Sequence, residues 1–134
     1  MHNFSLGKLY SRRFYALLRR RLDPDGVVAV QSTSPLMARR SFWCINRTLE
    51  AAGFQVRPYH ALVPSFGEWG YALAALHPFA PPQTVMAGLR YLDADTVRSL
   101  FVLGPDMAPV EAEVNLLNNQ ALVRYYEEEW RRWN

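Results

Sequence analysis

The stretch D-P-D-G-V-V-A-V-Q-S-T-S-P, residues 23–35, decides the fold that the sequence predicts. Proline cannot continue a helix and Asp-Gly favours a turn, so residues 23–26 should end the preceding segment. The short run Val27–Val30, rich in β-branched residues, indicates a strand buried on both faces, as in a parallel sheet. Gln31 then stands at the carboxyl end of this strand, before a polar break that ends in Pro35.

Helices are predicted on both sides of this strand. Ser11 is a suitable N-cap for a helix whose apolar side chains recur at helical spacing and should form one buried stripe: Phe14, Leu17, Leu18 and Leu22. A second helix is expected over residues 39–52, with Gly53 at its C′ position. Its inner stripe comprises Phe42, Ile45 and Leu49.

The second half of the chain contains a hairpin signal followed by further helices. Runs from Phe54 to Val63 and from Trp69 to Leu76 are separated by a short loop, which predicts an antiparallel hairpin. After a proline-rich connector, Asp93 is expected to cap a short helix over residues 96–102. A final helix is expected over residues 116–133, with Leu122, Tyr126, Trp130 and Trp133 on related faces.

This order of elements indicates an α/β fold: the C-terminal portion of a Rossmann-like, class I methyltransferase-type sheet that ends in an antiparallel hairpin, with C-terminal helices. Residues 1–78 are predicted to form the C-terminal half of the catalytic domain, and residues 79–134 a C-terminal helical extension of that domain. Because only part of such a sheet is present, we expect the isolated chain to be marginally stable, aggregation-prone or dimeric.

Composition limits the classes of protein that fit. Half of the 134 residues are hydrophobic and 20% are charged, which indicates a folded chain rather than a disordered one. No apolar stretch approaches the roughly 20 residues that span a bilayer, so no membrane insertion by this chain is expected. Cys44 is the only cysteine, which excludes an internal disulfide, favours a reducing cytoplasm and suggests a small core residue on a helix.

The charge distribution is explained best by solvated helix faces. The net charge of +3 comes from arginines near the start of the chain, and acidic residues are spread through the rest, so nucleic-acid binding is the least favoured hypothesis. The run Glu127–Glu129, followed by Arg131 and Arg132, is predicted to form a solvated, salt-bridged surface.

The chain contains no self-sufficient catalytic motif. None of its seven glycines forms a G-x-G pair, so the cofactor turn of a Rossmann-like enzyme is missing. Its three histidines show no metal-ligand spacing, and no G-x-S-x-G nucleophile elbow is present. No catalytic, cofactor-binding or metal-binding residue is therefore assigned, and no tightly bound cofactor is expected.

Four segments together resemble the C-terminal half of the polyamine aminopropyltransferases, the spermidine synthase family: Asn3–Leu22, Val27–Pro35, Pro64–Ala72 and Leu89–Leu103. K-L-Y-S-R-R-F-Y-A-L-L-R-R-R-L followed by the decisive stretch (residues 8–35) is similar to the helix, turn and strand of that family that end in glutamine. V-P-S-F-G-E-W-G-Y-A-L-A (63–74) is similar to its active-site loop and closing strand, and L-R-Y-L-D-A-D-T-V-R-S-L-F-V-L (89–103) to its C-terminal segment. Residues 110–115 and 122–133 resemble bacterial variants fused to membrane helices.

The resemblance implies a transferase of polyamine biosynthesis. Members of the family move an aminopropyl group from decarboxylated S-adenosylmethionine, a co-substrate, to putrescine, and form spermidine. Their paired acidic motif, D-x-x-D-P, and their cofactor glycines would precede Met1, so this chain alone should be inactive without a missing N-terminal half. The resemblance further implies a cytoplasmic enzyme whose parent protein is tethered to the inner membrane, and the incomplete sheet suggests a homo-oligomer.

Four residues are candidates for substrate binding on the basis of this resemblance. Gln31 matches the glutamine that contacts the substrate amine; a polar strand end bonded to backbone is the alternative. Phe66 lies where relatives have a substrate-contacting tyrosine, and Trp69 matches an apolar position in the polyamine channel, with hairpin packing as its alternative. Glu68 is a weaker candidate for an amine contact, because exposed loop glutamates are common.

Two other kinds of protein remain open at this point. A stand-alone remnant could bind a partner chain through an unpaired sheet edge and an exposed apolar stripe. A fragment of an S-adenosylmethionine-dependent methyltransferase would share the fold but not the chemistry. The strand-terminal Gln31 and the loop P-S-F-G-E-W-G argue against the methyltransferase.

Overall fold

The chain folds around a three-stranded antiparallel sheet. The computed structural model describes residues 7–132. Its strands are β1 (Val27–Gln31), β2 (Gln55–Val63) and β3 (Gly67–Ala75), arranged in the order β1-β3-β2. β3 is therefore the central strand and pairs antiparallel with both neighbours.

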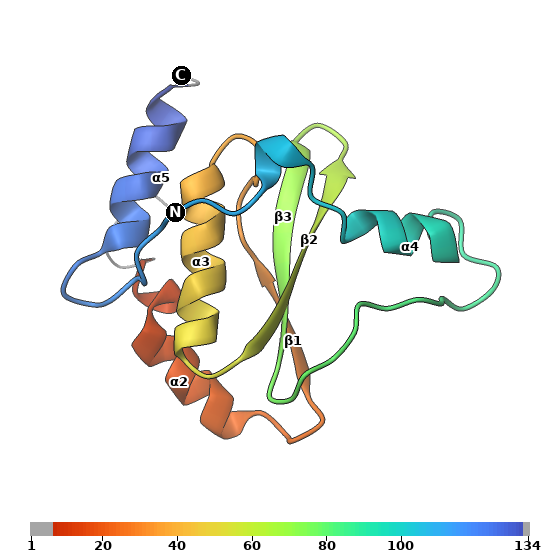
Figure 1. Cartoon of the computed structure of the whole chain (residues 1–134), viewed down its shortest axis with the longest axis horizontal. Helices are drawn as coiled ribbons and strands as arrows, with labels where there is room; N and C mark the ends of the chain where they lie inside the picture. The colour runs from red at the N-terminus through yellow and green to blue at the C-terminus, as the bar shows by residue number, and fades with distance from the viewer. Residues whose placement is uncertain (1–6, 133–134) are drawn as a thin grey trace.

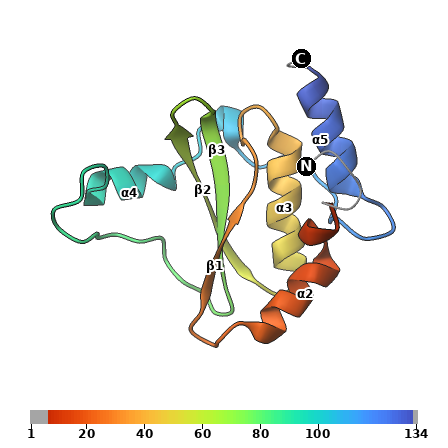
Figure 2. The same ribbon diagram turned by 180° about the vertical axis from the view of Figure 1, so that it is seen from behind.

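Helices cover both faces of this sheet. Figure 1 shows α3 (Arg39–Ala51) against one face, with α5 (Ala121–Arg131) on the outer side of α3 and α2 (Arg12–Arg21) near the lower end. The helix α4 (Ala94–Leu100) stands on the opposite face, and Figure 2 shows the same layers from behind. The helices are α2 (Arg12–Arg21), α3 (Arg39–Ala51), α4 (Ala94–Leu100) and α5 (Ala121–Arg131), with 3-10 turns η1 (Lys8–Tyr10) and η2 (Pro105–Met107). The predicted α/β class is thus confirmed.

The helix boundaries follow local sequence signals. The Ser11 hydroxyl accepts a hydrogen bond from Phe14 N at 3.2 Å, and the Asp93 carboxylate accepts one from Thr96 N at 2.7 Å, so both predicted N-caps are confirmed. Gly53, after α3, has a φ of +102°, the left-handed conformation that its C′ position requires.

The predicted hairpin is also present. β2 and β3 pair from Gln55 opposite Ala75 to Val63 opposite Gly67. Gly67, with a φ of +86°, begins the returning strand, where an L-residue would be strained. The hairpin places one face of β3 against α3, because alternate residues Ala72 and Ala74 are fully buried there.

The expectation for Val27–Val30 is wrong in two respects. β1 is antiparallel to β3, not part of a parallel pair among the described strands, and it lies at an edge of the sheet. Its residues alternate between exposed and half-buried, and Val27 is 55% exposed. A β-branched run predicts that a strand forms, but the neighbours of that strand depend on tertiary pairing.

The predicted buried stripe of α2 is right for Leu18 and Leu22 and wrong for Phe14 and Leu17. Phe14 and Leu17 are exposed, while Tyr15 is buried and Leu18 and Leu22 pack against the core. Both stripes fit helical spacing, so periodicity alone could not choose between them. The contact of α2 with α3 decides the question, because that contact buries Tyr15.

The final helix begins later than expected and buries an acidic residue. Gln120 adopts a left-handed φ of 47°, which delays the start of α5 to Ala121. The predicted positions Leu122 and Tyr126 lie on the helix, whereas Trp133 lies outside the described residues. Glu129 is only 7% exposed, so the expectation of a fully solvated Glu127–Glu129 run is wrong for this member.

Glu129 supplies the N-terminal cap that α3 lacks in its own sequence. The residue before α3 is Ala38, whose side chain cannot accept a hydrogen bond, and no acidic residue stands in the first turn. The Glu129 carboxylate accepts hydrogen bonds from Arg40 N (2.7 Å), Ser41 N (2.9 Å) and Ser41 Oγ (2.7 Å). A carboxylate from α5 thereby satisfies free N–H groups of α3 and compensates its dipole.

Backbone carbonyls fasten the segment between β3 and α5 to the rest of the molecule. Arg39 donates to Ala108 O at 2.8 Å, and Trp43 Nε1 donates to Met107 O at 3.0 Å. Near the start of the segment, Arg57 of β2 donates to Phe79 O at 2.9 Å. The donors are side chains of α3 and β2, whereas the acceptors are main-chain atoms.

Replacement of Glu129 by alanine should destabilise the fold. The substitution removes the acceptor of the part-buried Arg40 N–H and of the buried Ser41 N–H and hydroxyl, and a buried group left unsatisfied costs about 1–3 kcal/mol. We expect Glu129→Ala to lower the free energy of unfolding, measured with urea, by roughly 2–3 kcal/mol. The matched control Glu128→Ala removes an exposed carboxylate, 3.5 Å from Arg40, and should change it by less than about 1 kcal/mol. Equal effects of the two substitutions would contradict the capping role.

The buried thiol of Cys44 should be unreactive in the folded chain. Burial raises the pKa of Cys44 to about 12, and the side chain is fully buried in the core, as predicted. Any stability due to this shift is complete below the ordinary thiol pKa near 9 and is lost as pH rises toward 12. At pH 8, Ellman's reagent should label Cys44 only after urea unfolds the chain. Stoichiometric labelling without denaturant, at the rate of a free thiol, would disprove this.

Candidate functional site

Two cavities meet at Gln31 and Trp69, on the adjacent strands β1 and β3. The first, about 220 Å³, is lined by Gln31, Val63, Phe66, Trp69 and Tyr71 and is called here the sheet-face cavity. The second, about 130 Å³, is lined by Tyr10, Gln31, Thr33, Ile45, Trp69 and Tyr126 and is called the helix-side cavity. Strand pairing creates the junction, because Gln31 lies opposite Tyr71 in the register of β1 and β3.

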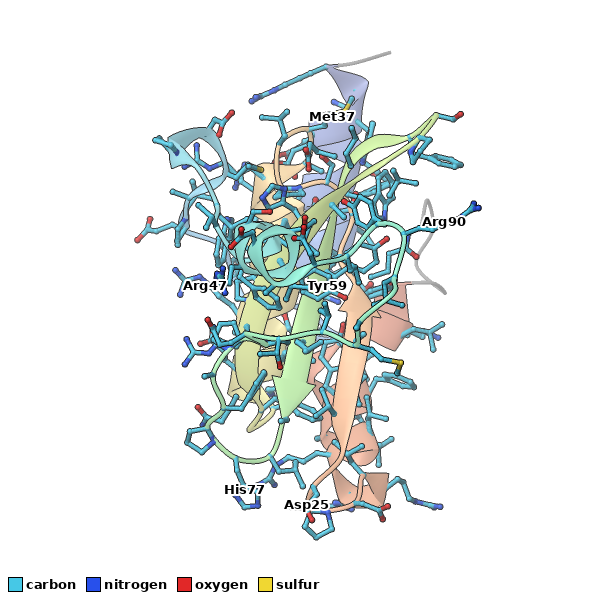
Figure 3. The ribbon with its side chains drawn as sticks, turned by 90° about the vertical axis from the view of Figure 1, so that its right-hand side faces the viewer. Asp25, Met37, Arg47, Tyr59, His77 and Arg90 are labelled. Carbon is cyan, nitrogen blue, oxygen red and sulfur yellow. The ribbon has the colours of Figure 1, made fainter. Side chains whose placement is uncertain are left out.

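Aromatic rings dominate the sheet-face cavity. The Phe66 and Trp69 rings meet edge-on with centroids 6.4 Å apart, and Tyr71 stacks on Tyr59 at 5.1 Å. Tyr59 in turn contacts Phe101, which follows α4, so the cavity opens on the face of the sheet that carries α4. Figure 3 shows α4 in front of the strands, with Tyr59 beside it. None of the five lining residues is charged, and Gln31 provides the only amide.

Tyr59 remains a neutral neighbour of this cavity. Burial, and secondarily Tyr71, raises the pKa of Tyr59 above its ordinary value. Its hydroxyl therefore stays protonated through the neutral range. The ring acts as support for Tyr71, which faces the cavity, rather than as a source of charge.

Three of the four predicted site residues share the sheet-face cavity, and the fourth does not. Phe66 is 70% exposed at the hairpin loop and lines the mouth with Trp69 and Gln31. Glu68 belongs to the other face of β3, because neighbouring strand residues point in opposite directions. There its carboxylate lies 2.7 Å from His60 Nδ1.

His60 links Glu68 to the segment that follows α4. Its Nε2 lies 2.7 Å from the carbonyl oxygen of Val102, while Nδ1 faces Glu68. Both neighbours of the ring are oxygen atoms that accept hydrogen bonds. This arrangement gives Glu68 a structural partner away from the two cavities.

Close backbone approach at Gly70 holds the junction together. A Cβ atom built on Gly70 would lie 2.4 Å from Phe42 and 2.8 Å from the carbonyl oxygen of Thr33. Gly70 N donates to Thr33 O at 2.5 Å, and Ser32 N donates to Gly70 O at 2.8 Å. The segment after β1 is thereby fixed against β3, and this brings Thr33 beside Trp69.

Tyr71 and Thr33 also line these cavities but were not predicted from the sequence. For Tyr71, the sequence does contain a signal. Tyr71 stands two residues after Trp69, so the period of a strand places both rings on one face. Thr33 lies after the strand in an irregular segment with a φ of +56°, a conformation that no periodicity reveals. Its position depends on the hydrogen bonds to Gly70.

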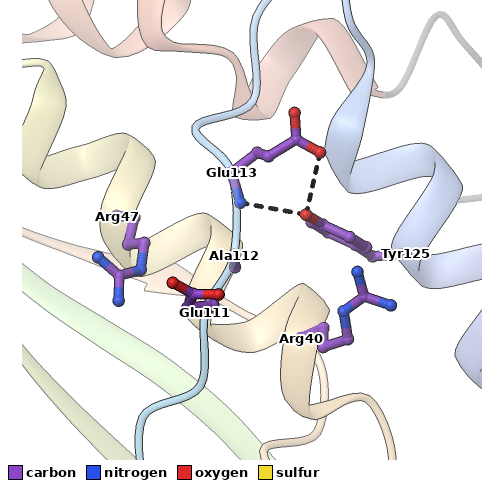
Figure 4. Close-up of a pocket in the computed structure, with 6 residues that line it drawn as sticks. All are labelled: Arg40, Arg47, Glu111, Ala112, Glu113 and Tyr125. Atoms are coloured by element: carbon purple, nitrogen blue, oxygen red, sulfur yellow. Dashed lines mark hydrogen bonds between the residues drawn. The ribbon is translucent and has the colours of Figure 1, made fainter.

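A third cavity, about 430 Å³, lies at another place and is lined by a charged surface network. It is lined by Arg40, Arg47, Glu111, Ala112, Glu113 and Tyr125 (Figure 4). The Arg40 guanidinium lies 4.2 Å from the Tyr125 ring centre, and Glu113 bonds Arg124 at 2.9 Å and the Tyr125 hydroxyl at 3.2 Å. The Arg124 hydrogen bond, followed by that of Tyr125, lowers the pKa of Glu113. Most of these groups thus serve one another as partners, as in a structural ion-pair network.

Residues 7–132 contain no group of three or more His, Cys, Asp or Glu side chains placed to hold a metal ion. Within the same residues, no helix is both long and apolar enough to cross a membrane.

Comparison with curated proteins identifies close relatives. A polyamine aminopropyltransferase of Ralstonia nicotianae is 55% identical over 130 residues, which cover 96% of this chain and 26% of the relative. That of Leptospira interrogans is 48% identical over 130 residues, covering 97% of this chain and 26% of the relative. The chain therefore spans about a quarter of the length of these relatives.

Comparison with solved structures supports the fold. The spermidine synthase of Thermotoga maritima matches 72% of this chain and 36% of its own, with a TM-score of 0.59 and 23% identity. A second spermidine synthase structure, in complex with the transition-state analogue AdoDATO, matches with the same TM-score and identity and covers 72% of this chain and 37% of its own. Both neighbours confirm the methyltransferase-like arrangement that the order of elements predicted.

The family model for the spermine/spermidine synthase domain matches residues 4–80, more than half of the chain. These residues include β1 and the β2–β3 hairpin, which carry the sheet-face cavity. The chain belongs to the spermine/spermidine synthase family.

Proposed function

We propose that the chain is the amine-binding part of a polyamine aminopropyltransferase that transfers an aminopropyl group from decarboxylated S-adenosylmethionine to putrescine. One observation carries the proposal: Gln31, Phe66 and Trp69 line a single cavity where β1 ends. In open α/β sheets, ligands bind at the carboxyl ends of strands. The relatives of this chain are named polyamine aminopropyltransferases.

The cavity suits an aliphatic diamine. Phe66, Trp69 and Tyr71 offer apolar ring surface to a methylene chain, and an aromatic face attracts a cationic end group. The side-chain oxygen of Gln31 can accept a hydrogen bond from an amine or ammonium nitrogen. These residues would orient the nucleophile so that its nitrogen attacks the carbon bonded to the sulfonium sulfur in line with the leaving group.

Residues outside the sheet-face cavity must complete the reaction. The amine nitrogen forms a bond to carbon, the carbon–sulfur bond breaks with its electrons moving to sulfur, and a base removes one amine proton. None of the five lining residues is a carboxylate, and Glu68 is directed to His60. We assign the base and the co-substrate site to a preceding half of the parent enzyme, which the acidic motif of the family suggests. The isolated chain is then inactive.

We also propose the domain boundaries, the cellular location and the oligomeric state that the sequence predicts. Residues 1–78 form the C-terminal half of the catalytic domain, and residues 79–134 form its helical extension. The parent enzyme is cytoplasmic, tethered to the inner membrane and homo-oligomeric. AdoDATO, present in one structural neighbour, points to the same class of transition state.

A second candidate function rests on the edge of the sheet. β1 pairs with β3 on one side, and its other edge has no strand partner among the described residues. Val27 on this strand is 55% exposed. Such an edge can recruit a strand of another chain, so a partner-binding remnant is the alternative to an enzyme part.

A segment exchange tests the proposed function. The 130-residue matching stretch of the Ralstonia nicotianae relative would be replaced by this chain. The purified hybrid should produce spermidine and methylthioadenosine from decarboxylated S-adenosylmethionine and putrescine, at a rate within about tenfold of the parent, a difference of roughly 1.4 kcal/mol. A hybrid that melts like its parent but transfers no aminopropyl group would contradict the proposal and favour the partner-binding alternative.

Substitution of Gln31 in that hybrid tests its role. Loss of a hydrogen bond to a charged group costs about 1.5–3 kcal/mol, so Gln31→Leu should lower kcat/KM for putrescine by roughly 10- to 100-fold. The control is Gln83→Leu, which alters an exposed glutamine bonded to Pro81 O in the connector. The proposed role of Gln31 would be contradicted if neither substitution changed kcat/KM for putrescine, or if both lowered it by the same factor.

A further inference from the structure

The helix α2 carries apolar side chains on two of its faces. On the inner face, Tyr15 is buried, and Leu18 and Leu22 pack against the core. On the outer face, Phe14 is 38% exposed and Leu17 is 50% exposed, and their spacing of three residues makes them neighbours on the helix surface. An amphipathic helix at a protein surface has a single apolar stripe. A second stripe therefore indicates a second layer of protein, beyond the one that the described residues supply.

The strand that follows α2 is open on the same side of the molecule. β1 pairs with β3 along one edge, and its other edge has no strand partner within residues 7–132. The inner neighbour of α2 is α3, which packs on β2 and β3, so α2 occupies the part of the molecule that lies toward β1. Figure 3 shows this arrangement, with β1 as the orange arrow to the right of β3 and α2 behind it. The outer face of α2, represented by Phe14 and Leu17, and the free edge of β1 are together called the open flank.

Arginines surround the apolar side chains of the open flank. Arg13 and Arg21 stand four residues before and after Leu17, and Arg20 stands three residues after it, so all three border Leu17 on the helix surface. These arginines are exposed, and none has an ion-pair or hydrogen-bond partner within the described part of the chain. An apolar centre with a polar rim rich in arginine is typical of a protein–protein interface. The complementary surface should carry apolar side chains opposite Phe14 and Leu17, and carboxylates opposite the arginines.

The length of the relatives identifies a source for this complementary surface. The chain covers 26% of the polyamine aminopropyltransferase of Ralstonia nicotianae and 36% of the spermidine synthase of Thermotoga maritima. Most of either protein thus lies outside the matched part. An unpaired strand edge recruits a further strand. The remainder of the parent enzyme is favoured over a second copy or an unrelated protein, because covalent linkage gives it a high effective concentration at this edge.

We propose that the open flank is the interface between this chain and the preceding part of the parent enzyme. A strand of that part pairs with the free edge of β1, and an apolar element of it packs on Phe14 and Leu17, with carboxylates toward the arginines. The choice of occupant rests on the proposed function, which places a preceding half in the same polypeptide. Gln31 ends β1 and lines the sheet-face cavity, so docking on this edge brings the co-substrate half beside the amine site.

Hydrogen exchange of the isolated chain and of the segment-exchange hybrid tests the strand pairing. On the free edge of an antiparallel pair, alternate amides lack a hydrogen-bond partner and exchange fast whatever the stability of the fold. We expect the fast amides of residues 27–31 to exchange at least about tenfold more slowly in the hybrid. Residues 82–88 of the largely exposed connector are the internal control and should exchange at equal rates in both proteins. Fast exchange of these β1 amides in a folded hybrid would overturn the proposal, whether or not that hybrid transfers an aminopropyl group.

Leu17→Gln tests the apolar half of the open flank. The residue is half exposed in the isolated chain, so the substitution should move the melting temperature of that chain by less than about 1 °C. In the hybrid it places an amide against apolar side chains, and we expect the melting temperature to fall by roughly 2–4 °C. The matched control Leu62→Gln alters an exposed leucine on the opposite edge strand, β2, and should change the melting temperature of neither protein.

Two results of these substitutions would overturn the proposal without reference to enzymatic activity. One is an equal effect of Leu17→Gln on the isolated chain and on the hybrid, which would make Leu17 part of the chain's own fold. The other is a dimer of the isolated chain, seen by analytical ultracentrifugation, that Leu17→Gln dissociates, because this would assign the open flank to a second copy. Loss of transfer alone, with the expected exchange and melting results, would contradict the proposed function and leave the interface standing.

Discussion

The carboxylate of Glu129 connects the two ends of the described fold. It closes the N-terminus of α3, which has no acceptor of its own, and thereby fixes α5 against that helix. The segment after β1 leads directly into this N-terminus, with Ser34 Oγ accepting bonds from Leu36 N and Met37 N on the way. Glu129 thereby fixes where this segment enters α3, while the hydrogen bonds between Gly70 and the segment after β1 fix Thr33.

Local chemistry made much of the fold predictable. The hydroxyl of Ser11, the carboxylate of Asp93 and the permissive backbone of Gly53 act within a few residues, so their effects can be read without a structure. The predictions were wrong where contacts between elements distant in sequence determine the position or burial of a residue. The edge position of β1, the choice of Tyr15 over Phe14 and the burial of Glu129 each depend on elements remote in sequence.

The candidate site itself stays a prediction, but the structure shows which of its residues lie together. Resemblance to aminopropyltransferases pointed to Gln31, Phe66 and Trp69, and these three lie on one cavity. Glu68 came from the same loop, but the alternation of strand residues sends it to His60 on the other face. Thr33 could not be predicted, because its place follows from a close approach between Gly70 and a turn rather than from any pattern of side chains.

The segment between β3 and α5 is attached through its main-chain carbonyls. This attachment constrains the identity of the donor residues more strongly than that of the acceptor residues. Every residue type carries a main-chain carbonyl, so residues 79, 107 and 108 can change identity while the acceptor persists. The donors have no such freedom, because few side chains reach as far as Arg39 or Arg57 or present a ring N–H like Trp43. Substitutions should therefore accumulate faster in the attached segment than at the donor residues Arg39, Trp43 and Arg57.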